Sequence, residues 1–83
     1  MTLEKDLKQE TEKWLKKIRT ERKKIKLAES SKENMLKNMD AYISDSGHFL
    51  EKSDLIRSFE AVIWAWSILE LGLELEIFKK SEK

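Results

Sequence analysis

The sequence predicts an all-α protein, a three-helix bundle in which an antiparallel helical hairpin follows a long, charged N-terminal helix. The 83 residues include no proline and two glycines, and 40% of them are charged. This composition is typical of long helices that face solvent. Apolar residues also recur at three- and four-residue steps in three successive segments. We therefore expect a single helical domain over residues 1–83.

The first helix is expected from about residue 2 to about residue 28. One side of it carries a narrow seam at alternating four- and three-residue steps, interrupted by Glu21: Leu7, Thr11, Trp14, Ile18 and Ile25. The rest of the circumference is charged, so this helix should bury a single stripe. The sequence leaves open whether it packs lengthwise on its own chain or crosses to another subunit.

The second helix is expected from about residue 31 to about residue 52. Ser30 and Glu33 have the spacing of a capping box, in which each side chain accepts from the backbone amide of the other residue. The apolar face that follows is wide: Met35, Leu36, Met39, Tyr42, Ile43, Phe49 and Leu50. Ser53 and Asp54 then predict a tight turn and a new N-cap, which makes the second and third helices a hairpin.

The third helix is expected from about residue 54 to about residue 79, and it carries two apolar stripes on nearly opposite sides. The first consists of Leu55, Phe59, Val62, Trp66, Leu69, Leu73 and Ile77. The second steps like a coiled-coil seam through Trp64, Ile68, Leu71, Leu75 and Phe78. Both stripes continue beyond Gly72, so we expect the helix to pass through it. A compact triangle of helices uses one face of each, so the second stripe predicts either a flat layer or a contact surface for another chain.

From Ala41 onward the chain contains one run of residues that matches a known pattern: Ala41-Tyr42, Asp45-Ser46, Phe49-Leu50-Glu51-Lys52, Asp54, Phe59-Glu60-Ala61 and Trp64-Ala65. Through this run the chain resembles an archaeal family known as domain of unknown function 357. The resemblance implies a short, cytoplasmic archaeal protein with an all-helical fold. It brings no activity, cofactor or catalytic residue.

The residues give little basis for catalysis or for a cofactor. Without cysteine the chain can form no disulfide, no cysteine-based zinc site and no thiol nucleophile. The single histidine, His48, lies among polar positions of its helix, and its acidic neighbours lack the loop spacing of a calcium site. We therefore expect no enzymatic activity, no metal and no cofactor.

Seven basic residues against one acid between Trp14 and Leu27 raise the alternative of weak, non-specific nucleic-acid binding. The candidate contacts are Lys16, Lys17, Arg19, Lys23, Lys24 and Lys26. They spread around the polar side of the helix, and residues 28–83 hold seven basic and eleven acidic groups, which would repel a polyanion. We therefore rank nucleic-acid binding below the protein-interaction hypothesis.

The leading hypothesis is a non-catalytic protein-interaction or self-assembly module, whose partner is a second copy or a helical protein. Its expected interface is Trp64, Ile68, Leu71, Leu75 and Phe78, together with Trp14 and Ile18. A membrane role is not expected, because the longest stretch free of charge, Ala61 to Leu69, is too short to span a bilayer. The start of the sequence has no apolar leader-like segment, so we expect a cytoplasmic protein.

Overall fold

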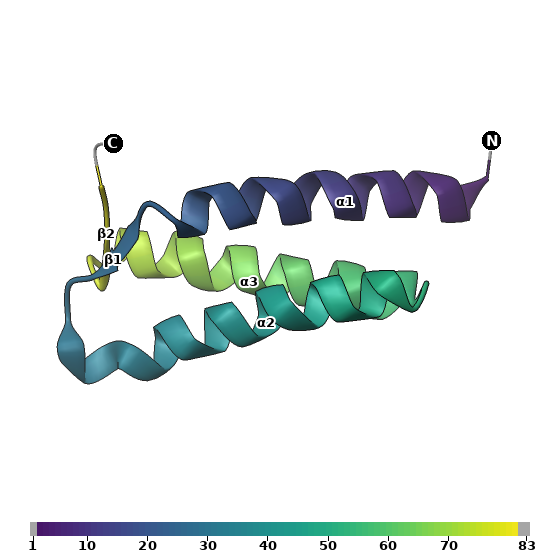
Figure 1. Ribbon diagram of the computed structural model, residues 1–83. Helices are drawn as coiled ribbons and strands as arrows, with labels where there is room; N and C mark the ends of the chain where they lie inside the picture. Colours follow the sequence, from purple (N-terminus) through teal and green to yellow (C-terminus); the bar gives the residue numbers. More distant parts are fainter. Residues whose placement is uncertain (1, 82–83) are drawn as a thin grey trace.

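Three helices and a small antiparallel sheet make up the computed structural model, which describes residues 2–81 (Figure 1). The elements in chain order are α1 (Leu3–Arg22), β1 (Ile25–Leu27), the short 3₁₀ helix η1 (Ser30–Lys32), α2 (Glu33–Glu51), α3 (Leu55–Glu74) and β2 (Phe78–Lys80). The predicted helical class with an α2–α3 hairpin is confirmed, and the sheet is an addition to it. Residues 1, 82 and 83 of the predicted domain lie outside the described residues.

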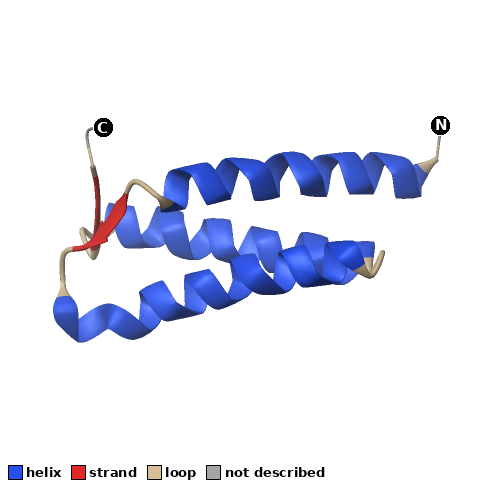
Figure 2. Cartoon of the chain, viewed as in Figure 1, coloured by secondary structure: helices blue, strands red, loops and turns tan. Residues whose placement is uncertain are grey.

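The helices lie side by side in an elongated bundle measuring 43 × 23 × 17 Å. In Figure 1, α2 and α3 form the antiparallel hairpin, and α1 runs along it in the same direction as α3. The first helix therefore packs lengthwise on its own chain. Figure 2 shows both strands at the end of the bundle opposite the α2–α3 turn.

The predicted first helix was too long, because it ends at Arg22 and not near residue 28. Residues Ile25–Leu27 leave the helix to form β1, which pairs antiparallel with β2 in the register Ile25 to Lys80 and Leu27 to Phe78. Backbone hydrogen bonds extend the pairing, as the Ala28 amide donates to the Ile77 carbonyl at 2.8 Å. Ile25 is buried as the helical seam predicted, but it reaches the core from a strand.

The predicted third helix was also too long. It passes through Gly72 but ends at Glu74. Two residues later, Glu76 takes a left-handed conformation with φ of 61°. The Ile77 amide donates to the Gly72 carbonyl at 2.8 Å and the Glu76 amide to the Leu73 carbonyl at 3.1 Å, the two bonds of a Schellman motif. The chain turns back onto the helix, and the Phe78 ring fills the space that a Cβ at Gly72 would occupy.

The two ends of α2 are formed by different local structures. No side chain caps its start, where η1 leads directly into Glu33, so the predicted Ser30 capping box does not form. Its end repeats the motif of α3: Ser53 has φ of 61°, and the Asp54 amide donates to the Phe49 carbonyl at 2.9 Å. The Asp54 side chain then caps α3 by accepting from the Arg57 amide at 3.3 Å.

Small residues hold the hairpin together. The side of α3 that is buried most deeply carries Ser58, Ala61, Ala65 and Gly72 between the two apolar stripes, so its backbone can lie close to its neighbours. Ser58 Oγ donates to the Ser46 carbonyl at 2.6 Å, and Ser46 Oγ donates to the Ser58 carbonyl at 2.8 Å. These reciprocal bonds satisfy both buried hydroxyls. The core continues toward α1 and the sheet through Leu15, Ile18, Met39, Val62, Leu69 and Phe78.

Candidate interaction surface and basic groove

Two tryptophans near the middle of α3 point in nearly opposite directions, because two helical positions span about 200°. Trp66 faces α1, where its ring meets Trp14 edge to face with 5.7 Å between ring centroids. Its indole Nε1 donates to the Trp14 backbone carbonyl at 3.1 Å. Both rings are half-buried. The predicted interface residue Trp14 is therefore used, at least in part, to join α1 to α3.

The other side of α3 is only partly covered by the rest of residues 2–81. Trp64 is 59% exposed, Leu71 49% and Leu75 57%, while Ile68 between them is half-buried. We call these four residues the Trp64 face. An exposed apolar patch of this kind on one helix side marks a contact site more often than isolated apolar residues do.

Two further residues of the predicted interface lie inside the protein. Phe78 is 1% exposed because β2 turns it onto Gly72 and into the core, and Ile18 is fully buried under the hairpin. Neither side chain is available to a partner in this structure. The predicted interface is corrected accordingly to the Trp64 face.

A groove of about 300 Å³ adjoins the Trp64 face on the side of α2, and sequence reasoning did not find it. It is lined by Tyr42, Asp45, Phe49, Arg57, Glu60, Ala61 and Trp64. Tyr42 stacks on Trp64 with 6.2 Å between centroids and 21° between planes, and the Arg57 guanidinium lies 5.8 Å from the Phe49 ring centroid. All of these residues except Arg57 belong to the run that carried the family resemblance, which was the available signal for the groove.

The exposed charged residues of α3 are mostly acidic. Helix α3 has no basic residue after Arg57, and its exposed positions include Glu60, Glu70 and Glu74. Glu60 lies beside the Trp64 face, because it shares the adjoining groove with Trp64, whereas Glu70 lies beside Trp66 on the other side of the helix.

The six basic residues predicted as nucleic-acid contacts do not form one surface. Lys16 and Lys17 line a groove between α1 and α3, whereas the Arg19 guanidinium lies against Gly47 of α2. Lys24 pairs with Glu21 at 3.5 Å. Lys23 and Lys26 are exposed beyond the end of α1, and Lys26 belongs to β1.

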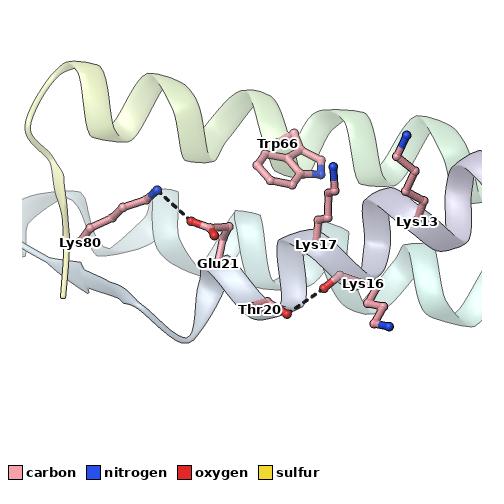
Figure 3. Close-up of a pocket in the computed structure, with 7 residues that line it drawn as sticks. All are labelled: Lys13, Lys16, Lys17, Thr20, Glu21, Trp66 and Lys80. Atoms are coloured by element: carbon pink, nitrogen blue, oxygen red, sulfur yellow. Dashed lines mark hydrogen bonds and ion pairs between the residues drawn. The ribbon is translucent and has the colours of Figure 1, made fainter. Parts of the chain in front are cut away.

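The groove beside α1 has a volume of about 780 Å³. It is lined by Lys13, Lys16, Lys17, Thr20, Glu21, Trp66 and Lys80 (Figure 3). Lys80 arrives from β2 and pairs with Glu21 at 2.8 Å. This contact with Lys80 lowers the pKa of Glu21 against the opposing effect of partial desolvation, and Lys24 lowers it further. No pattern in the sequence indicates this groove, because it forms only when the turn after α3 brings β2 back to the bundle.

The residues that sequence analysis considered for other chemistry lie apart. His48 is exposed, and its ring meets Phe49 with 5.9 Å between centroids. Within residues 2–81, no three histidine, cysteine, aspartate or glutamate side chains come together as a metal site would require. No helix in the same range combines the length and the apolar character needed to cross a bilayer.

Comparisons with known proteins find relatives of this chain. A family model described as "Protein of unknown function (DUF357)" matches residues 8–78, so the match includes most of α1 as well as the hairpin. The crystal structure of protein AF1782 from Archaeoglobus fulgidus, assigned to the same family model, is similar with a TM-score of 0.89 and 46% sequence identity. The similarity covers 96% of this chain and 100% of that one. A comparison with curated proteins gives no match.

Proposed function

The chain belongs to DUF357, a family of proteins of unknown function, and from that premise we propose that it is a non-catalytic protein-interaction or self-assembly module. The family brings no activity, so the proposal depends on the molecule's own surface. The observation that carries it is the Trp64 face, three of whose four side chains are exposed in the isolated chain.

Burial of the Trp64 face against a partner would contribute favourably to the free energy of binding. Full burial of a large apolar side chain contributes about 1.5–3 kcal/mol, and Trp64, Leu71 and Leu75 each retain about half of their surface for a partner to cover. Trp64 is also held in place by its stacking with Tyr42, so less side-chain entropy is lost on binding. A face of this shape suits an apolar helix lying along α3.

Charge favours a partner helix over a second copy. Two chains that met through the same face would bring like charges together, because Glu60 shares the adjoining groove with Trp64, Glu74 is exposed at the end of the helix, and no basic residue follows Arg57 in α3. A helix whose apolar seam is flanked by Lys or Arg would instead be attracted. We therefore favour a basic amphipathic helix of another protein as the partner.

Binding of two designed helical peptides tests this role. Both carry a leucine seam, flanked by lysine in one peptide and by glutamate in the other, and binding is followed by fluorescence anisotropy. We expect the lysine-flanked peptide to bind at least tenfold more tightly. Leu71→Glu should abolish this binding, whereas Ile56→Glu, at another exposed apolar position of α3, should leave it unchanged. Equal binding to both variants would contradict the proposal.

Sedimentation equilibrium separates self-assembly from partner binding. A monomer that binds the lysine-flanked peptide supports the partner form of the proposal. A dimer that Leu71→Glu converts to a monomer supports self-assembly through the same face. A monomer that binds neither peptide contradicts both forms.

Nucleic-acid binding through the basic half of α1 is the second candidate. The local charge excess of that segment supports it, while the separation of Arg19 from Lys16 and Lys17 weighs against it. Titration with RNA and DNA at low and high salt decides the matter. Undetectable affinity at low ionic strength would remove this candidate.

A further inference from the structure

The groove beside α1 combines an aromatic wall with a rim of ammonium groups. Helix α1 supplies Lys13, Lys16 and Lys17 at steps of three and one, which place them on neighbouring sides of the helix. Helix α3 supplies Trp66 and strand β2 supplies Lys80 (Figure 3). The groove therefore exists only when all three elements are assembled, and it lies on the side of α3 opposite the Trp64 face.

Part of the positive charge in this groove forms no ion pair with the residues that the structure describes. Among the described residues Glu21 is the one carboxylate in the lining, and it pairs with Lys80 at 2.8 Å and with Lys24 at 3.5 Å. Within residues 2–81, Lys13, Lys16 and Lys17 form no ion pair with a carboxylate. The Lys13 and Lys17 ammonium groups, which extend toward α3 in Figure 3, thus have no ion-paired carboxylate among the described residues, while Lys16 extends away from Trp66.

The aromatic wall is fixed before any ligand arrives. Trp66 is held by its hydrogen bond to the Trp14 carbonyl and by its edge-to-face contact with the Trp14 ring. The Lys17 and Lys13 ammonium groups lie 4.9 and 5.5 Å from the Trp14 ring centroid, which keeps both lysines beside the tryptophan pair. Apolar surface and positive charge are therefore held next to one another.

We propose that this groove binds a small anion that carries an aromatic ring beside a chain of phosphates, that is, a nucleoside polyphosphate. The Lys13 and Lys17 ammonium groups, with Lys16 next to them on α1, supply positive charge for the phosphates, and lysine is a common phosphate ligand. Trp66 offers apolar surface to the ring. The volume of about 780 Å³ lies in the range usual for small-molecule sites.

A compact ligand fits this surface better than a nucleic-acid strand. Arg19, which lies against α2, and Lys26, which lies on β1, do not line the groove. Residues 28–83 carry an excess of four negative charges, eleven acidic against seven basic groups, which would repel a long polyanion. This inference does not depend on the proposed protein-interaction role.

Titration calorimetry with the full chain tests the assignment, using adenosine triphosphate, tripolyphosphate and adenosine at one fixed ionic strength. We expect adenosine triphosphate to bind with a Kd below 1 mM, about tenfold more tightly than tripolyphosphate, because base–aromatic contact adds to phosphate binding. Adenosine alone should bind too weakly to detect. Absence of adenosine triphosphate binding, or equal affinity for tripolyphosphate, would overturn the proposal. If a single-stranded oligouridylate binds more tightly than adenosine triphosphate, with both affinities expressed per binding site, the proposal is also overturned.

Two variants that remove the same number of positive charges show whether adenosine triphosphate binds in the groove or responds only to the overall charge. The triple substitution Lys13→Gln, Lys16→Gln and Lys17→Gln should weaken adenosine triphosphate binding more than tenfold. The control Lys5→Gln, Lys8→Gln and Lys37→Gln removes the same charge from exposed positions outside the groove and should change affinity less than twofold. All six residues are exposed, so both variants should fold.

The indole N–H resonance of Trp66 gives an independent readout in the unmodified protein. It should shift on addition of adenosine triphosphate, while that of Trp64 stays in place. Equal loss of affinity in the two triple variants, or an unmoved Trp66 resonance at saturation, would show that the ligand is held by general charge and not by the groove.

Discussion

Trp64 and Trp66 stand two residues apart on α3 and have opposite fates. Trp66 lies against α1, with its ring edge on Trp14 and its N–H bonded to the Trp14 carbonyl. Trp64 is 59% exposed and has the Tyr42 ring as its aromatic neighbour. Because α1 covers one apolar stripe of α3 and α2 lies over the small residues between the stripes, Trp64, Leu71 and Leu75 of the second stripe are left exposed.

A pair of leucine substitutions provides the largest test of this difference. Leu69→Ala should lower the free energy of unfolding by about 2–5 kcal/mol, because Leu69 is 1% exposed and its removal leaves a cavity. Leu71→Ala should change it by less than about 1 kcal/mol, because that side chain is half in solvent. Urea denaturation of both variants measures the two effects. Similar losses would mean that the Trp64 face is buried in solution.

The hairpin contact between the two stripes predicts the next largest effect. Ser46→Ala and Ser58→Ala should each cost about 1–2 kcal/mol, since each hydroxyl donates to the carbonyl of the other residue in a buried setting. The double variant should cost less than the sum, because the two hydroxyls also contact each other at 3.2 Å. A double-mutant cycle followed by thermal unfolding measures this coupling. Strict additivity would show that the two serines act independently.

A smaller effect, this time an increase in the free energy of unfolding, is expected at the turn that brings β2 back to the bundle. Glu76 holds a left-handed conformation with φ of 61°, which glycine adopts without strain. Glu76→Gly should raise the free energy of unfolding by about 0.5–1 kcal/mol. Glu74→Gly, in the last turn of the helix proper, is the matched control and should be destabilising. If both substitutions destabilise, the turn differs from the Schellman geometry.

The smallest effect concerns the ion pair in the basic groove. Lys80 lowers the pKa of Glu21 in the folded protein, so the pair adds stability above the pKa that Glu21 has in the unfolded chain. This contribution is lost as the pH falls through the lowered pKa of the folded state. Glu21→Gln should therefore lower the melting temperature at neutral pH and have no effect in strong acid. A difference that is independent of pH would argue against the pair.

The helical segments were predictable from the sequence because their apolar residues recur at helical spacing. The predicted ends of α1 and α3 lay too far along the chain, since β1 and β2 have three residues each and continue the apolar pattern of the helices. No glycine marks the left-handed residue after α2 or α3, where Ser53 and Glu76 stand, so the usual signal for a helix end was missing.

The candidate sites were predictable to different degrees. Trp64, Ile68, Leu71 and Leu75 followed from helical spacing alone, whereas Phe78 was misplaced because its segment leaves the helix. The most deeply buried side of α3 was not predicted, because the apolar stripes were defined by large residues. The spacing of the small residues Ser58, Ala61, Ala65 and Gly72 would have indicated it. The basic groove could not be predicted, because Lys80 and α1 are far apart in the sequence.

The solvent exposure of the tryptophans tests the central claim most directly. In protein labelled with 5-fluorotryptophan and assigned through single Trp→Phe variants, ¹⁹F NMR in H₂O and D₂O reports the exposure of each ring. We expect a large solvent isotope shift for Trp64 and a small one for Trp66, and the lysine-flanked peptide should reduce the Trp64 shift alone. Equal shifts for the two rings, or a peptide that leaves Trp64 unchanged, would contradict the assignment of the Trp64 face as the contact surface.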